Sequence, residues 1–165
     1  MNTVYIGLGS NLSQPAKQLK NAVQTISTIE QCQIQKISSL YFSRPMGPQD
    51  QPDYMNAVLS LTTSLTAIEL LTVLQTIENN VGRLRKDNRW DARILDLDIL
   101  LFGQQFINND RLTIPHYGMK VREFVLLPLH EISPTLILPC GDSLDELIQG
   151  LDQNGLKVFD NSLQL

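Results

Sequence analysis

Two aspartates lie one residue apart in the strongest predicted strand of the sequence, residues 95–102. Asp96 and Asp98 alternate with apolar residues, so both carboxylates would project from one face, about 6.5–7 Å apart along the backbone. Aspartate is a poor strand former, and like charges on one face repel each other. One or two Mg²⁺ ions would relieve that repulsion and could bridge the carboxylates to a polyphosphate. The alternative is a solvent-facing strand in which an arginine neutralises one aspartate.

A basic stretch comes directly before the aspartates, although the formal net charge of the chain is −4. Its members are Arg83, Arg85, Lys86, Arg89 and Arg93. Arginine offers planar, bidentate donors to phosphate oxygens. Trp90, the only tryptophan, lies among them and could stack on a nucleobase or on an arginine. The stretch favours a small anionic ligand, with a solvated loop and a core tryptophan as the alternatives.

Other polar residues are weaker candidates for a site. His116 lies in a turn between Pro115 and Gly118, where it could donate to phosphate or be structural. We interpret His130 as structural. Tyr54 and Asn56 share the less apolar face of a strand, where an aromatic plane beside an amide could bind a flat heterocycle. On this evidence alone, a half-exposed strand face explains them better.

Several functional classes are excluded or disfavoured. The sequence contains no Gly-Lys-Ser or Gly-Lys-Thr, which excludes a P-loop, and residues 7–12 lack the third glycine of a dinucleotide fingerprint. We interpret Gly9-Ser10-Asn11 as a tight turn. Two cysteines and two histidines argue against a disulfide framework and a zinc site. The negative charge argues against a nucleic-acid partner. With no signal peptide and no apolar run of about 20 residues, we expect a cytoplasmic monomer without a membrane partner.

The predicted elements alternate in a way that defines a fold class. We expect a strand at 3–8, a helix beginning near Pro15, and strands at 34–42 and 55–61, the second with one buried face. Thr66 and Glu69 form a capping box for a helix that ends at Gly82. The strand at 95–102 follows, with 105–108 returning antiparallel to it and short helices at 119–127 and 143–149. This order predicts a ferredoxin-like α+β sandwich, two helices covering one face of an antiparallel sheet, plus extra C-terminal elements, in one domain spanning residues 1–165.

Three blocks of sequence, in this order and spacing, resemble the 6-hydroxymethyl-7,8-dihydropterin pyrophosphokinase family of folate biosynthesis. The blocks are GPQDQPDYMN at 47–56, RWDARILDLDIL at 89–100 and RLTIPHY at 111–117. The likeness extends from residue 7 to about residue 139. It implies a ferredoxin-like fold and transfer of the terminal pyrophosphoryl group of ATP to the pterin hydroxymethyl, giving AMP and the pterin diphosphate.

The resemblance also implies a role for individual residues. Those implied to be catalytic are Asp96, Asp98, Arg83 and Arg93, with the two aspartates holding two Mg²⁺ ions. Those implied to bind ATP are Gln75, Glu78, Arg85, Trp90, Ile99, Arg111, Leu112, Thr113, His116, Tyr117 and Arg122. Those implied to bind the pterin are Ser43, Met46, Tyr54, Asn56 and Phe124, with Tyr54 and Phe124 on either side of the ring. The chain departs from the family at Asp91-Ala92, where a glycine is usual, and at Ser43-Arg44, where Thr-Pro is common.

Two rival functions lead to different expectations. A nucleotidyltransferase also combines Gly-Ser with Asp-x-Asp, but there the Gly-Ser turn lies shortly before the aspartates, whereas Ser10 and Asp96 are far apart in this chain. It would release pyrophosphate rather than AMP. A ferredoxin-like RNA-binding module would need exposed sheet aromatics and a basic surface. The sequence offers few candidates for exposed sheet aromatics, and its net charge is negative.

Overall fold

The computed structural model describes residues 1–11, 14–43, 54–82, 94–151 and 157–160. Within these ranges an antiparallel six-stranded sheet has the order β5-β1-β4-β3-β8, and β2 also pairs with β4. Its strands are β1 (Asn2–Ser10), β2 (Cys32–Ile37), β3 (Leu40–Ser43), β4 (Tyr54–Thr63), β5 (Asp96–Phe102) and β8 (Lys157–Asp160). This arrangement confirms the predicted α+β class.

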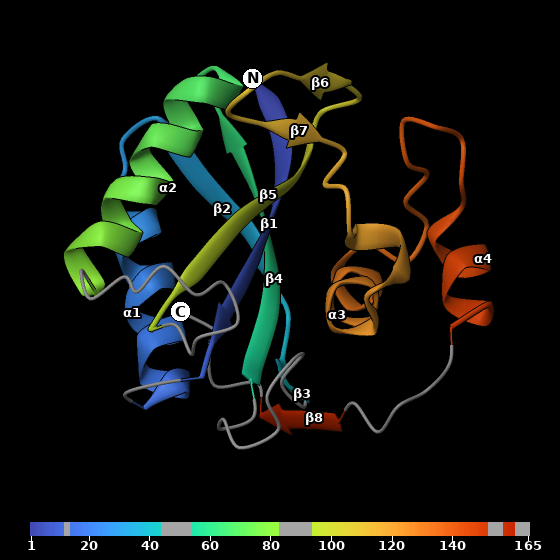
Figure 1. The fold of residues 1–165 in the computed structure, drawn as a ribbon, viewed down its shortest axis with the longest axis horizontal. Helices are drawn as coiled ribbons and strands as arrows, with labels where there is room; N and C mark the ends of the chain where they lie inside the picture. Colours follow the sequence, from blue (N-terminus) through green and yellow to red (C-terminus); the bar gives the residue numbers. More distant parts are fainter. Residues whose placement is uncertain (12–13, 44–53, 83–93, 152–156, 161–165) are drawn as a thin grey trace.

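Helices cover both faces of this sheet (Figure 1). The helices α1 (Pro15–Ser27) and α2 (Ala67–Val81) lie together on one face. On the other face lie α3 (Glu123–Ile132) and, beside it, α4 (Leu144–Gln149). A short hairpin of β6 (Ile107–Asn108) and β7 (Thr113–Ile114) and the 3₁₀ turn η1 (Met119–Val121) connect β5 to α3. None of the helices in the described ranges has the length and apolar character needed to cross a bilayer.

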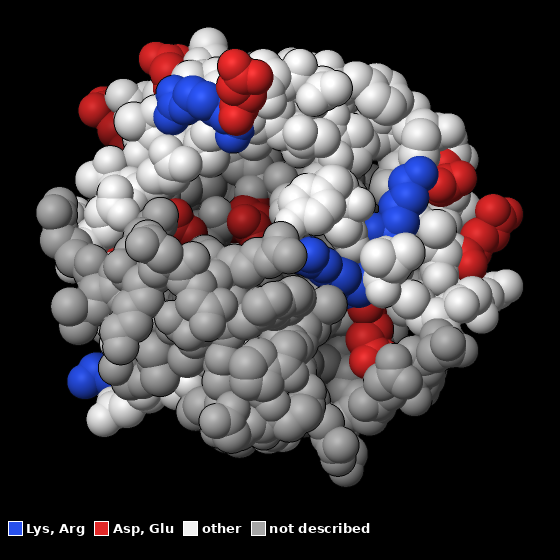
Figure 2. Space-filling view, viewed as in Figure 1, with Lys and Arg blue, Asp and Glu red and all other residues white. Residues whose placement is uncertain are grey.

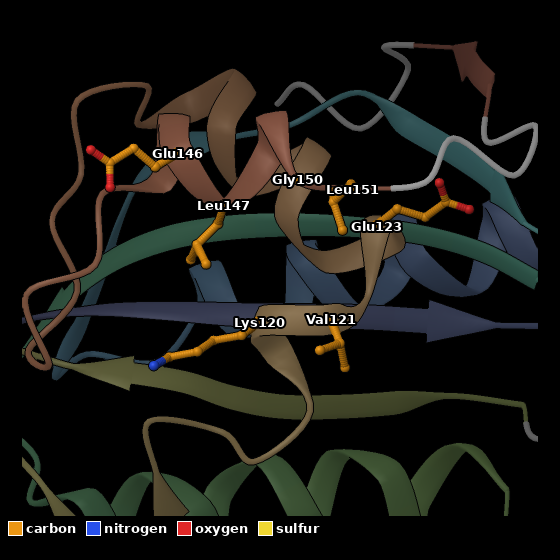
Figure 3. Close-up of a pocket in the computed structure, with 7 residues that line it drawn as sticks. All are labelled: Lys120, Val121, Glu123, Glu146, Leu147, Gly150 and Leu151. Atoms are coloured by element: carbon orange, nitrogen blue, oxygen red, sulfur yellow. The ribbon is translucent and has the colours of Figure 1, made fainter.

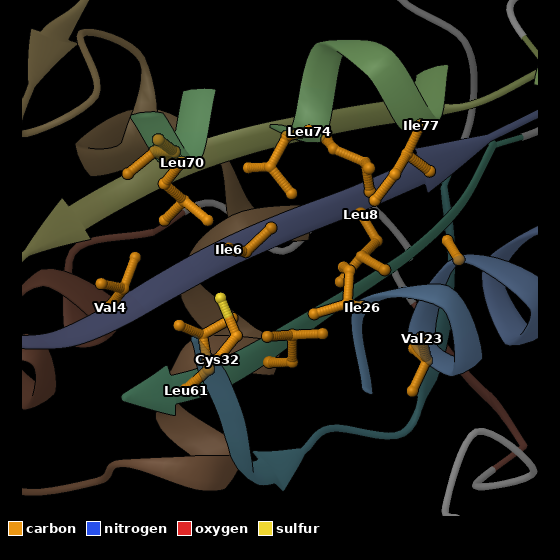
Figure 4. Packing of buried hydrophobic residues seen from close by; sticks show 14 of the residues in the cluster. Val4, Ile6, Leu8, Val23, Ile26, Cys32, Leu61, Leu70, Leu74 and Ile77 are labelled. Atoms are coloured by element: carbon orange, nitrogen blue, oxygen red, sulfur yellow. The ribbon is translucent and has the colours of Figure 1, made fainter. Parts of the chain in front are cut away.

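The main core lies between the sheet and the pair α1 and α2. Apolar residues at helical spacing face the sheet from both helices, and alternate residues of β1 meet them (Figure 4). Alternate residues of β5 belong to the same core. The buried members include Leu19, Ala22, Val23, Ile26, Leu70, Leu74, Ile77, Val4, Ile6, Leu8, Leu97 and Ile99. Burying one face of each strand in this way determines which side chains are left to point away from α1 and α2.

The two ends of α2 are set by local sequence, as expected. Thr66 Oγ1 accepts the Glu69 N–H at 3.2 Å, and the Glu69 carboxylate accepts the Thr66 N–H at 2.9 Å. Gly82 ends the helix in an extended conformation rather than a left-handed one. A Cβ there would lie 2.7 Å from Cδ1 of Ile94. Ile94, two residues before β5, therefore packs directly against the helix end, and a side chain at residue 82 would force Ile94 to shift.

A second core lies on the opposite face, which corrects the expectation that the strand at 55–61 has one buried face. Val58, Leu100 and Leu101 of the sheet pack with Leu126 and Leu129 of α3, so β4 is buried on both sides. His130 Nε2 lies 2.5 Å from Asp145 Oδ1 and joins α3 to α4, as expected of a structural histidine.

Three predicted elements differ in the structure, each for an identifiable reason. The strand expected at 34–42 is interrupted at Ser38, whose backbone and hydroxyl both hydrogen-bond to Val58. Residues 107–108 pair with β7 rather than with β5. The expected helix at 119–127 is η1 followed by α3, which continues through Pro128 to Ile132. Proline removes only one backbone donor from that helix, and Pro128 is buried.

Candidate active site

The two aspartates project from the sheet face that points away from α1 and α2. Leu97 and Ile99 are 4% and 3% exposed in the main core, so Asp96 and Asp98, at alternate positions, point the other way. Asp96 is half-buried and Asp98 is exposed. Both carboxylates thus share one accessible face at the edge of the sheet, as the alternation predicts. Figure 2 shows acidic side chains within a hollow on the face that it views, and a basic side chain beside them.

Glycines lie opposite both aspartates on the neighbouring strand. Asp96 pairs with Gly9 and Asp98 pairs with Gly7 in the β1–β5 register, so β1 places no side chain beside either carboxylate. Gly9 also pairs with Asn56 on β4, and a Cβ at Gly9 would lie 3.1 Å from Asn56 Oδ1. A side-chain-free strip therefore separates Asp96 from Asn56. Gly9 and Ser10 belong to β1, which corrects their interpretation as a tight turn.

Polar side chains from other elements hold the backbone around the aspartates. Ser10, which is fully buried, donates from its hydroxyl to the carbonyl of Ile94. The Glu78 carboxylate of α2 accepts the Leu97 N–H at 2.8 Å. That N–H lies between the two aspartates in sequence and on the open edge of the sheet. Glu78, implied by the resemblance to bind ATP, thus also contacts the strand that carries both carboxylates.

A cluster of rings and a guanidinium follows β5. The His116 N–H donates to the Leu100 carbonyl at 3.0 Å, which ties the cluster to β5 two residues after Asp98. The His116 ring stacks on Tyr117, with centroids 4.7 Å apart and an interplanar angle of 22°. The Arg122 guanidinium lies 5.4 Å from the Tyr117 ring centroid and 5.8 Å from that of Phe124. These predicted site residues therefore lie together.

The protonation of His116 follows from its surroundings. The Gly118 N–H donates to Nδ1 of His116 at 3.2 Å, so the neutral imidazole carries its proton on Nε2. Burial first, and the charge of Arg122 second, lower the pKa of His116 below its ordinary value. Near neutral pH this side chain is therefore a neutral hydrogen-bond donor through Nε2.

Two more predicted residues, Arg111 and Gln75, meet where the β6–β7 hairpin approaches α2. Arg111 donates from its guanidinium to Thr72 Oγ1 at 3.2 Å and to Gln75 Oε1 at 3.4 Å. The Asn109 side chain accepts the backbone N–H groups of Arg111 and Leu112 at 2.9 and 3.0 Å. The sequence analysis predicted neither the contact of Thr72 with Arg111 nor the role of Asn109 in the hairpin turn. An asparagine in a short turn is a recognisable signal for such a role.

The remaining predicted residues fall into three groups. Tyr54 is half-buried, Asn56 is 5% exposed on the same face of β4, and Phe124 is half-buried in the first turn of α3. Ser43 pairs in register with Tyr54. Ile99 and Leu112 have their side chains in the main core, and Thr113 is exposed. The predicted residues that lie outside the described ranges are Met46, Arg83, Arg85, Trp90 and Arg93.

A separate groove of about 390 Å³ lies between η1 and α4 (Figure 3). Its lining is Lys120, Val121, Glu123, Glu146, Leu147, Gly150 and Leu151. None of the predicted site residues within the described ranges lines this groove, which distinguishes it from the face that carries the aspartates.

Comparisons with known proteins agree on one family. The sequence matches the model of 7,8-dihydro-6-hydroxymethylpterin-pyrophosphokinase over residues 5–134. A 2-amino-4-hydroxy-6-hydroxymethyldihydropteridine pyrophosphokinase of Haemophilus influenzae is 52% identical over 149 residues, covering 90% of this chain and 92% of that protein. A protein of the same name from Pseudomonas aeruginosa is 45% identical over 154 residues, and the match covers 93% of this chain and 94% of that protein.

A solved structure also resembles this fold. The HPPK-DHPS protein of Plasmodium falciparum, crystallised with SDX-DHP, matches with a TM-score of 0.67 at 14% sequence identity. The match covers 90% of this chain and only 43% of the Plasmodium chain. At that identity the likeness concerns the fold alone, and it supports the arrangement of the sheet and its helices.

The pKa of His116 is open to direct test. We expect its imidazole to titrate below the ordinary histidine value in NMR spectra of the protein, and Arg122→Met to raise the midpoint only part of the way, because burial is the larger cause. Since the folded pKa is lowered, the stability that His116 contributes is present above its unfolded pKa and is lost as pH falls through the folded pKa. A midpoint at or above the ordinary value in the wild-type protein would contradict this description.

Proposed function

This chain belongs to the 7,8-dihydro-6-hydroxymethylpterin-pyrophosphokinase family, and we propose that the sheet face carrying Asp96, Asp98 and Asn56 is its active site. The chain is an ATP-dependent pyrophosphokinase that transfers pyrophosphate to 6-hydroxymethyl-7,8-dihydropterin in folate biosynthesis. Removing the pyrophosphoryl group from ATP leaves AMP, and the second product is the pterin diphosphate.

The observation that carries this assignment is the pair of carboxylates facing the glycine strip. Their oxygens are hard donors of the kind that Mg²⁺ prefers. In the described residues no group of three or more His, Cys, Asp or Glu side chains could hold a metal by itself, so Asp96 and Asp98 would fill only part of a coordination sphere. Phosphate oxygens of ATP would complete it for two Mg²⁺ ions. When bound, Mg²⁺ neutralises phosphate charge and lowers the pKa of the acceptor hydroxyl.

The cluster that follows β5 supplies donors for the phosphate chain. His116 offers a neutral Nε2–H, and Arg122 offers a guanidinium that the Tyr117 and Phe124 rings help to orient. Gln75 and Arg111, which contact each other, would bind the nucleoside end. Arg83, Arg85, Trp90 and Arg93 keep their predicted roles in phosphate binding and lid closure as proposals from sequence.

The pterin would lie between β4 and α3. The Asn56 amide can pair with a heterocycle, and Tyr54 and Phe124 provide the rings for stacking on either side. Ser43 and Met46 would complete the pocket. Asn56 and Asp96 are separated by two strand spacings, about 9.6 Å, with only Gly9 between them. The strip therefore directs the hydroxymethyl group of a pterin held at Asn56 toward the aspartates.

The chemistry asks these residues mainly for positioning and charge stabilisation. The acceptor oxygen attacks the β-phosphorus and AMP leaves, while the donors around His116 and Arg122 hold the phosphate chain in line. No residue need act as a dedicated general base. A cytoplasmic location, a monomeric state and a single domain spanning residues 1–165 remain predictions from the sequence.

An assay with Mg²⁺, ATP and 6-hydroxymethyl-7,8-dihydropterin tests the proposal. We expect AMP from the wild-type protein, and we expect Asp96→Ala and Asp98→Ala each to lower turnover by about 10³-fold or more, comparable with removing a principal electrostatic group from an active site. Both variants should remain folded, because Asp96 and Asp98 lie outside the two core layers.

Glu30→Gln is the matched control for these variants. Glu30 is an exposed carboxylate between α1 and β2, and its loss should leave turnover unchanged. Near-normal activity of either aspartate variant would refute the proposed site, and release of pyrophosphate instead of AMP would favour the nucleotidyltransferase alternative.

The glycine strip predicts a separate effect on pterin binding. Gly9→Ala places a Cβ 3.1 Å from Asn56 Oδ1, which displaces the amide and should raise the KM for the pterin by about tenfold, equivalent to about 1.4 kcal/mol. In Gly7→Ala the nearest neighbour of the new Cβ is Leu100, at an ordinary 3.5 Å, so its pterin KM should stay nearer the wild-type value. Equal pterin KM values for the two variants would contradict the role given to the strip. The measurement is steady-state kinetics with each substrate varied in turn.

A further inference from the structure

Glu131, in the last turn of α3, binds the beginning of β3 with both carboxylate oxygens. The Ser39 N–H donates to Oε1 and Oε2 at 3.1 and 3.0 Å, and the Ser39 hydroxyl donates to Oε2 at 2.9 Å. The Tyr41 hydroxyl donates to Oε1 at 2.7 Å. Hydrogen bonds to a charged acceptor are stronger than neutral ones. One side chain therefore links α3 to two residues of the same strand segment.

The strand that Glu131 binds leads directly to the proposed pterin pocket. Tyr41 pairs with Asn56, and Ser43 pairs with Tyr54. Tyr41 is 8% exposed, and its hydroxyl points to α3, so its ring lies on the same sheet face as the side chain of Asn56. Directly opposed residues on one face are neighbours. Fixing the Tyr41 hydroxyl thus fixes the ring beside the amide that would recognise the heterocycle.

The same helix carries the opposite wall of the pocket. Phe124 precedes Glu131 by seven residues in α3, a spacing that returns to the same helix face after two turns, about 10.5 Å along the axis. Both side chains therefore face the sheet. Glu131 therefore links the C-terminal end of this helix to β3, the strand that pairs with Tyr54 and Asn56, and contributes to the spacing between α3 and the sheet.

Two other polar contacts hold the end of α3 but reach different strands. The Tyr5 hydroxyl and the Ser133 hydroxyl are 2.9 Å apart, and Lys36 Nζ donates to the Ile132 carbonyl at 3.4 Å. These contacts dock the helix on β1 and β2. They provide a natural comparison, because they stabilise the same helix without touching β3.

We propose that Glu131 is a positioning residue for the pterin pocket, which sets the place of Tyr41 beside Asn56 and the spacing between the sheet and Phe124. This inference rests on the proposed active site and deepens it. Glu131 touches neither substrate. It acts through β3 and α3 on the pterin pocket, whereas His116, which would face the phosphate chain, is held by the Leu100 carbonyl of β5.

Kinetics of Glu131 variants test the proposal. We expect Glu131→Ala to raise the KM for the pterin by about tenfold, as the loss of charge-assisted hydrogen bonds implies, with the KM for ATP within about twofold of wild type. Glu131→Gln, which keeps one acceptor oxygen, should give a smaller rise. Tyr41→Phe should also raise the pterin KM alone, and combining it with Glu131→Ala should add little, because both changes break one network.

Ser133→Ala is the matched control, since it removes the Tyr5 contact of the same helix and should leave the pterin KM unchanged. An unchanged pterin KM in a folded Glu131→Ala protein, or an equal rise for both substrates, would overturn the proposal. So would an equal effect of Ser133→Ala. If Glu131→Ala does not fold, as judged by thermal unfolding, Glu131→Gln and Tyr41→Phe decide the matter, and wild-type pterin KM values in both would overturn it. Absence of AMP formation by the wild-type protein would instead refute the proposed function.

Discussion

Repulsion between Asp96 and Asp98 is the constraint around which the rest of the site is built. The two carboxylates lie at alternate positions of one strand and therefore project from the same face. A third carboxylate, that of Glu78, accepts a hydrogen bond from the Leu97 N–H between them. The fold accepts this concentration of negative charge at an edge strand, where solvent and cations have access. The opposing glycines of β1 leave that space clear. Like charges at neighbouring positions of one face cost stability, and the proposed Mg²⁺ ions would offset that cost.

The two core layers place the remaining groups around this point. Packing of α1 and α2 on one face forces Asp96, Asp98 and Asn56 to point to the other. The second core layer, formed with α3, covers Val58 and Leu100 and brings the first turn of that helix near the same face. The site is therefore bounded by the sheet on one side and by the N-terminal end of α3 on the other, with β5 contributing the charge.

Much of this could be predicted from the sequence because the signals are local. Alternation revealed the shared face of Asp96 and Asp98, and the Thr66–Glu69 pair located the start of α2. Individual site roles came from the family resemblance rather than from periodicity. Gly9 was misassigned because a glycine before polar residues usually signals a turn. Here it continues β1, and its pairing with Asn56 and Asp96 cannot be predicted from the neighbouring residues. Glu131 was missed because its partners lie 92 and 90 residues away.

The most direct test of the central claim is a crystal structure of the protein with Mg²⁺ and a non-hydrolysable ATP analogue. We expect one oxygen from each of Asp96 and Asp98 to lie about 2.1 Å from a Mg²⁺ ion that also contacts the phosphate chain, above the strip formed by Gly7 and Gly9. A bound nucleotide with no cation at these carboxylates, or carboxylates directed to opposite faces of the sheet, would contradict the account.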